Sequence, residues 1–188
     1  MGKRHMTKDQ ILASMRTVKK MTLCGDRGSF TGMATLCNYI LWKEEKWYQK
    51  KLVEYNAAVA VYDQKLDSGE VTLEQLTERL WNKADFKVQY EKQTEKDIQA
   101  RKNSFLYEME KRLIESNNTI NEIATRYFLM HFNVLMDMGY GKKRLVRNSD
   151  YINHYLGNVV TKDGSRIMDL HRELIDKAGI YVEMPVIL

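Results

Sequence analysis

The chain has 188 residues, of which 44% are hydrophobic and 29% charged, a composition typical of a folded domain and not of a disordered protein. It has no run of the roughly 18–20 apolar residues that a membrane-spanning helix needs, and two cysteines are too few for a disulfide-rich scaffold. Thirty basic and 25 acidic residues give a net charge of +5, less than a dedicated nucleic-acid-binding domain usually carries. The single proline favours long helices.

The charge is distributed unevenly along the chain. Residues 1–35 hold seven basic and two acidic side chains, whereas residues 67–100 hold five basic and eight acidic ones. A basic end of this kind can meet phosphates or an acidic protein surface, and an ordinary solvated surface of uneven charge is the alternative.

The N-terminal region contains no secretory signal. No apolar segment follows its basic residues. We expect residues 1–5 to be a tag or start remnant before a natural start at Met6, because the His5-Met6 pair is typical of a cloning site. Cys24 and Cys37, with no signal peptide before them, favour a reducing intracellular compartment.

The first half of the chain predicts three helices. Thr7 with Gln10 forms a capping box that opens the first helix, and a glycine-rich turn at 24–29 ends it. Helical periodicity then continues from Phe30 to Leu66, a helix about 54 Å long. Such a helix exceeds what a domain of this size needs, so it predicts a homodimer. A second capping box, Thr72 with Gln75, opens a short helix over 72–83.

The middle of the chain predicts a short strand and a buried helix. Alternating apolar residues allow a strand within 84–97. The helical pattern resumes from residue 98 to 138, with a kink or short break expected at 116–118, and residues 123–138 are apolar on most sides.

After Gly139 and Gly141, we expect a helix over 148–156 and a final one from Ser165 to Gly179. The alternating tail 180–185 allows a minor two-stranded β piece beside residues 159–160. The sequence therefore predicts an all-α or mainly α fold, with residues 6–188 as a single helical domain.

No sequence pattern for catalysis or metal binding is met. The glycine spacing at 139–143 fails the phosphate-loop pattern, no histidines or cysteines have zinc-ligand spacing, and Ser29 is not in a nucleophile elbow. His131 is interpreted as a hydrogen-bonded core histidine. Arg126, Asp137 and Glu122 are interpreted as a buried Arg–carboxylate pairing. We predict a protein that is not an enzyme, with no cofactor and no metal site.

A basic cluster flanked by tyrosines is the candidate binding site. Cations with aromatic neighbours suit phosphates and unstacked bases, but Tyr and Arg also dominate protein–protein hot spots, so the cluster does not discriminate between these partners. Its members are Tyr140, Lys142, Lys143, Arg144, Arg147 and Tyr151. A second segment with interleaved lysines and aromatic residues is interpreted as core packing with a solvated face; it contains Trp42, Lys43, Lys46, Trp47, Tyr48, Lys50, Lys51 and Tyr55.

The overall pattern resembles small helical proteins encoded by phages and mobile elements of gut Firmicutes, some of them related to type II anti-CRISPR proteins. The stretches that carry the resemblance are Cys24–Phe30 with Gly32 and Met33, Asn38–Lys43, Asn118–Glu122 with Arg126 and Tyr127, Gly139–Leu145, and Gly179–Pro185. Together they extend over most of the chain from Met6 onward, but they form no diagnostic motif and transfer no functional residue.

The resemblance implies a non-enzymatic inhibitor that binds an RNA-guided DNA nuclease with its guide RNA, in the cytoplasm of a bacterial host. The alternative is a helical nucleic-acid-binding accessory protein for phage replication or transcription. A membrane partner is not expected from the sequence.

Overall fold

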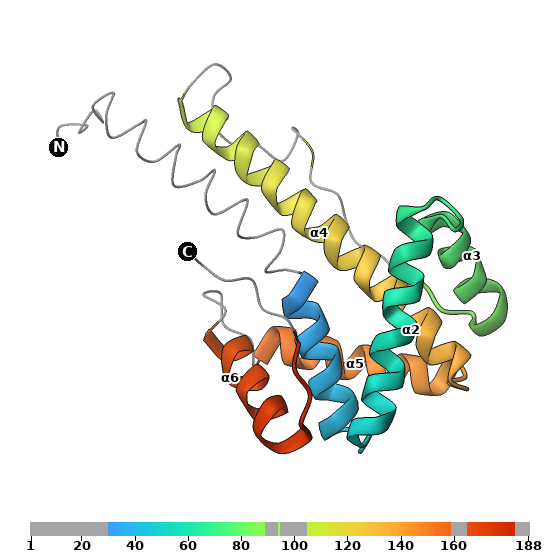
Figure 1. Cartoon of the computed structure of the whole chain (residues 1–188). Helices are drawn as coiled ribbons and strands as arrows, with labels where there is room; N and C mark the ends of the chain where they lie inside the picture. Colours follow the sequence, from blue (N-terminus) through green and yellow to red (C-terminus); the bar gives the residue numbers. More distant parts are fainter. Residues whose placement is uncertain (1–29, 89–93, 95–104, 159–164, 183–188) are drawn as a thin grey trace.

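The computed structural model describes residues 30–88, 94, 105–158 and 165–182 (Figure 1). Every regular element within these ranges is helical and none is a strand, which confirms the all-α prediction. The capped helix expected from Thr7 and the turn at 24–29 lie outside the described residues.

The single long helix predicted from Phe30 to Leu66 is wrong. One helix covers residues 30–43, and a second, α2, covers Gln49–Asp67. Between them Lys46 adopts a left-handed conformation with φ of 56°, and the Trp47 amide donates to the Leu41 carbonyl at 3.0 Å. The reversal buries the Trp47 ring against Tyr55 and Tyr140, so core burial outweighs continuation of the helix. The homodimer stays a prediction, but the long helix from which it was inferred does not form.

The short helix predicted over 72–83 is confirmed as α3 (Leu73–Ala84). Thr72 Oγ1 accepts from the Gln75 amide at 3.2 Å, and the Gln75 side chain accepts from the Thr72 amide at 2.9 Å. Both bonds of the capping box are therefore present, and they fix where the helix begins.

Replacing Thr72 with Ala is expected to lower the free energy of unfolding by about 1 kcal/mol, because the Gln75 amide loses its acceptor. Urea denaturation followed by circular dichroism measures this loss. Thr72→Ser keeps the hydroxyl and serves as the matched control, with stability close to that of the unaltered protein. Equal losses in the two variants would contradict the role of the cap.

The strand expected within 84–97 is absent from residues 85–88. Asp85 ends α3 in a left-handed conformation with φ of 48°, and the next side chain, Phe86, is buried against Phe132 with ring centroids 4.6 Å apart. Apart from Thr94, the rest of the predicted strand lies outside the described residues.

The break predicted at 116–118 is also wrong, because α4 runs without interruption from Phe105 to Asp137. Poor intrinsic propensity costs only tenths of a kcal/mol per residue, which tertiary packing readily overrides. The prediction of a buried C-terminal half is confirmed. The buried residues on it are Tyr127, Leu129, Met130, His131, Phe132, Asn133, Val134 and Leu135.

The helix predicted over 148–156 begins earlier than expected, at Lys142, and continues as α5 to Asn158. Gly139, with φ of 87°, ends α4, and the Tyr140 amide donates to the Leu135 carbonyl at 2.9 Å. Asn148 and Ser149, the two residues that the pattern favours as its cap, lie inside α5, and the Asn148 side chain is fully buried. The basic cluster is therefore mostly on a helix and not on a loop.

The final helix is confirmed, as α6 (Ser165–Glu173) followed by a π-helical turn, η2 (Leu174–Ala178). Gly179 ends η2 with φ of 65°. Residues 180–182 form no strand; Ile180 is buried in the core, and His171 Nε2 bonds to the Val182 carbonyl at 2.6 Å. The other residues of the predicted β piece, 159–160 and 183–185, lie outside the described residues.

The C-terminal half of α4 is the centre of the core. In Figure 1, α3 lies beside the end of α2, α5 passes behind α2, and α6 lies beside the helix at 30–43. Both α2 and α3 contact α4. The largest fully buried aliphatic residues come from the helix at 30–43 and from α2, α3, α4 and α5, and they include Leu36, Ile40, Leu52, Leu80, Leu135 and Leu145. This packing places the basic cluster near the 44–48 turn and leaves α3 on an outer side.

Candidate partner-binding surfaces

The predicted basic cluster is built around one buried carboxylate that sequence reasoning missed. The Glu45 side chain is only 4% exposed and lies in the turn between the first helix and α2. Arg147 donates to both of its oxygens, at 2.9 Å to each. Tyr140 donates its hydroxyl to Glu45 at 3.1 Å, and Arg144 lies 3.5 Å away. Three of the six predicted site residues therefore converge on Glu45.

The other three predicted residues are placed differently. Lys142 forms an ion pair with Asp85, and Lys143 is exposed without an ion pair among the residues that the structure describes. Tyr151 is half-buried and packs against the core. Of the four cations, two thus bind Glu45, one binds Asp85, and Lys143 keeps its charge unpaired.

Tyr140 lies in the core and not on an exposed stacking platform. Its side chain is 2% exposed, and the Arg144 guanidinium lies 3.7 Å from its ring centroid. Burial, together with the Glu45 carboxylate, raises the pKa of Tyr140 to about 12. The hydroxyl therefore stays protonated and donates to Glu45 throughout the physiological range.

The two segments that are rich in lysine and aromatic residues, one around Trp47 and one around Tyr140, lie side by side in the folded chain. Trp47 packs edge-on to Tyr140 with centroids 6.0 Å apart, and Lys51 Nζ lies 4.1 Å from the Trp47 ring. Tyr48, next in the chain, is 84% exposed. We call the combined surface the basic end; its cations are Lys46, Lys50, Lys51, Lys142, Lys143, Arg144 and Arg147. Spacing gave no signal for it, because Glu45 and Arg147 are 102 residues apart.

A second surface of opposite character lies on the outward side of α3. Trp81 is 46% exposed and Leu73 37% exposed, and Glu74 and Glu78 are exposed between them. The amide at the helix start and the Thr72 hydroxyl lower the pKa of Glu74, so it is ionised at neutral pH. Lys87 Nζ lies 4.3 Å from the Trp81 ring. We call Leu73, Glu74, Glu78 and Trp81 the α3 face.

An open pocket of about 730 Å³ lies between α2, α3 and the end of α4. Its walls are mainly apolar, and the residues that line it include Ala58, Val61, Lys65, Glu70, Val71 and Leu76. Lys65 and Glu70 form an ion pair at 2.9 Å.

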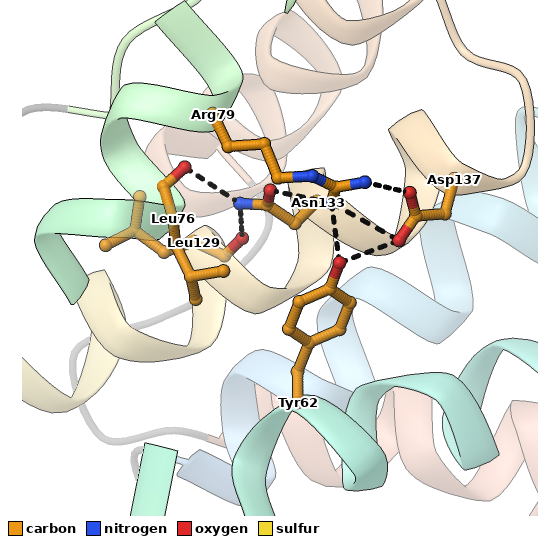
Figure 2. A network of polar contacts seen from close by, with 6 residues as sticks. All are labelled: Tyr62, Leu76, Arg79, Leu129, Asn133 and Asp137. Atoms are coloured by element: carbon orange, nitrogen blue, oxygen red, sulfur yellow. Dashed lines mark hydrogen bonds and ion pairs between the residues drawn. The ribbon is translucent and has the colours of Figure 1, made fainter. Parts of the chain in front are cut away.

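Figure 2 shows the polar network at one side of this pocket. Arg79 donates to Tyr62, Asn133 and Asp137, and the Tyr62 hydroxyl donates to Asp137 at 2.7 Å. Burial alone would raise the pKa of Asp137, but hydrogen bonds from Arg79 and Tyr62 lower it below its usual value. Asn133 also donates to the carbonyls of Leu76 and Leu129, at 3.2 and 2.8 Å. These mutual bonds tie α2, α3 and α4 together, so the network is structural.

The predicted pairing of Arg126 with Asp137 or Glu122 is not what the structure forms. Arg126 binds Asp63 at 2.6 Å and Asp67 at 2.6 Å, both on α2, whereas Asp137 binds Arg79. Proximity in the sequence suggested that Arg126 pairs with carboxylates on its own helix, α4. In the folded chain the carboxylates that contact it come from α2, across the interface between the two helices. His131 is a hydrogen-bonded core histidine, as predicted.

Comparison with known proteins gave no match: no family model, no curated protein and no solved structure is similar to this chain. None of the helices in the described part of the chain is long and apolar enough to cross a membrane. Among the same residues, no three His, Cys, Asp or Glu side chains gather so as to hold a metal ion.

Proposed function

We propose that this protein is a non-enzymatic interaction protein of a phage or mobile element, which inhibits an RNA-guided DNA nuclease of type II systems by binding it. The α3 face is the observation that carries the proposal. Such an inhibitor acts in the cytoplasm of the bacterial host, where the nuclease holds its guide RNA.

The α3 face has the chemistry that a nucleic-acid channel attracts. Channels that hold a guide–target duplex are positively charged, so they favour exposed carboxylates that take the place of phosphates. Glu74 and Glu78 supply the charge, and the half-exposed Trp81 supplies a large anchor of the type that dominates binding energy. The basic end would be repelled by the same channel, so it faces away in such a complex.

The test is binding of the RNA-loaded nuclease to immobilised protein, together with inhibition of DNA cleavage. Trp81→Ala is expected to weaken binding by at least about tenfold, and Glu74→Gln with Glu78→Gln is expected to reduce the association rate and its salt dependence. Met168→Ala removes an equally exposed apolar side chain on α6, so it is the matched control and is expected to bind normally. Unchanged inhibition by Trp81→Ala and by the double Gln variant would contradict the proposal.

The basic end favours a second candidate, a nucleic-acid-binding accessory protein for phage replication or transcription. Lys50 and Lys143 are exposed, and Tyr48 offers an exposed ring between Lys46 and Lys50. If phosphates bind there, Lys50→Ala and Lys143→Ala each lower the salt slope of DNA or RNA binding by about one unit. Nucleic-acid binding with no affinity for the nuclease would favour this candidate over the first.

A further inference from the structure

The outward side of α2 is apolar, although its inward side already packs into the core. Leu52, Tyr55 and Val59 are buried, as expected for one face of an amphipathic helix. On the opposite side Val53 is 54% exposed and Val61 49% exposed, and both lie on α2, which Figure 1 shows crossing in front of α5. Ala57, Ala60 and Gln64 lie on the same exposed side, which we call the α2 face, and the exposed Lys50 and Glu54 lie beside them in its N-terminal half. Val53, Ala57, Ala60 and Val61 form the apolar part of this face.

The α2 face continues into the open pocket. Val61 belongs to both, and the pocket extends the apolar surface along the C-terminal half of α2 to Val71 and Leu76. The N-terminal end of α2 carries Tyr48, which is 84% exposed. One helix therefore has an exposed ring at one end and a hollow at the other.

The two ends of α2 carry charges of opposite sign. The N-terminal end has three exposed or half-exposed cations, Lys46, Lys50 and Lys51, against one exposed carboxylate, Glu54. The C-terminal end has three carboxylates, Asp63, Asp67 and Glu70, which pair with two cations among the described residues, Arg126 and Lys65. The helix dipole adds to this polarity, positive at the N-terminus and negative at the C-terminus.

We propose that the α2 face is a homodimer interface, in which α2 of one chain packs antiparallel against α2 of a second copy across a two-fold axis near Ala57. A two-fold interface requires that if residue i contacts residue j, then j contacts i. The α2 face meets this requirement: its apolar middle packs on itself, and the cations at the N-terminal end of α2 meet the carboxylates at the C-terminal end of α2 in the second copy.

The register follows from helix geometry. Tyr48 and Leu66 each lie nine residues from Ala57, which is about 13.5 Å along the helix axis. Tyr48 of each chain then lies at the level of the pocket on the second copy. Ala57 and Ala60 have small side chains, which let the two helices approach closely at the axis.

A second copy fits this surface better than an unrelated helix does. In an antiparallel pair of α2 helices, the cations at each N-terminal end meet the carboxylates at the C-terminal end of the other copy, so both ends of the charge pattern are used. An unrelated helix needs to match only one of these ends. The interface uses no residue of the α3 face, so dimerisation and nuclease binding can be tested separately. Because one helix pair with a pocket contact is a small interface, we expect dimerisation that depends on concentration.

Light scattering over a concentration series is the first test. We expect the mass to rise from 22.2 kDa toward twice that value by about 100 µM. Ala57→Glu places two like charges across the axis and is expected to remain a monomer throughout. Tyr48→Ser provides the serine hydroxyl that an N-cap favours and removes the ring, so its melting temperature should be equal or higher while its dimer dissociation constant rises at least about tenfold. Met168→Glu on α6 is the control and should dimerise normally.

Disulfide cross-linking tests the register, with Cys24→Ser as the background so that Ala57→Cys supplies the reactive thiol. Mild oxidation of Ala57→Cys is expected to give a cross-linked species of twice the chain mass, because residues on the axis meet their own copies. Asn82→Cys, exposed on α3, is the matched control and should remain uncrosslinked. A wild-type protein that stays at 22.2 kDa, or a dimer that Ala57→Glu leaves intact, overturns the proposal and leaves the α2 face to a different protein.

Discussion

Acidification from pH 7 to pH 4 is expected to lower the free energy of unfolding by about 3 kcal/mol through His131 alone. Burial lowers the pKa of His131 from 6.5 to about 4. Between these two values the unfolded chain binds a proton that the folded chain excludes, so stability rises with pH across this window. Above pH 6.5 the histidine is neutral in both states and its contribution to the pH dependence ends.

The surroundings of His131 explain why the neutral form is held. Its side chain is fully buried, and its Nδ1 lies 2.7 Å from the Tyr55 hydroxyl while its Nε2 lies 2.7 Å from Asn148 Oδ1. Asn148 Oδ1 accepts only, so the proton is on Nε2 and Nδ1 accepts from Tyr55. A second proton would face the Tyr55 hydroxyl, which is itself 3.2 Å from Tyr127. Burial raises the pKa values of Tyr55, Tyr127 and the nearby Cys37, so these groups stay neutral and offer no counter-charge.

Urea denaturation at pH 4, 5, 6 and 7 measures the effect, with His131→Gln as the comparison. This variant is expected to be less stable at pH 7, because it loses shape complementarity in a fully buried site, but its stability should depend less steeply on pH between 6.5 and 4. Carboxylates with lowered pKa values, Asp137 and Glu173, contribute equally to both proteins and cancel in the difference. The same pH dependence in both proteins would show that His131 is not the responsible group.

Replacing Arg147 with Ala is expected to lower the free energy of unfolding by about 2 kcal/mol, because it removes the bidentate partner of a buried carboxylate. Glu45 keeps Tyr140 at 3.1 Å and Arg144 at 3.5 Å, so its charge is not left entirely uncompensated. Arg147→Lys is expected to recover only part of the loss, since an ammonium group cannot form the two-pronged contact.

Thermal and urea denaturation of these variants provide the measurement, and Lys143→Ala on the same helix is the control. Lys143 is exposed and its removal should change the stability by less than about 0.5 kcal/mol. Equal stabilities of Arg147→Ala and Lys143→Ala would contradict the role assigned to Glu45. The result also affects binding experiments: a combined replacement of all four clustered cations would weaken the fold as well as any phosphate contact.

The helical class and several helix ends were predictable because their causes are local. The capping box at Thr72 and Gln75 uses contacts within four residues. Gly139 and Gly179 end helices because each adopts a left-handed conformation that other residues rarely take. The apolar pattern of α4 identified the central buried helix, because a helix surrounded by protein on most sides must be apolar on most sides.

Tertiary packing decided where a helix continues or ends when the local sequence pattern indicated otherwise. The turn at 44–48 contains neither glycine nor proline, and Lys46 takes a positive φ because burial of the Trp47 ring compensates for the strain. In the same way α4 continues through weak helix formers at 116–118. The differences in propensity at these positions are small compared with the free energy of burying a large side chain.

The composition of the candidate surfaces also depended on tertiary structure. The sequence identified Lys142, Lys143, Arg144 and Arg147 as a basic cluster, and the structure places all four on α5. Only the folded chain brings Glu45 beneath two of them, from 99 and 102 residues away. Periodicity along one helix shows which side chains share a face, but an ion pair depends on the three-dimensional approach of segments distant in sequence, which local patterns do not encode.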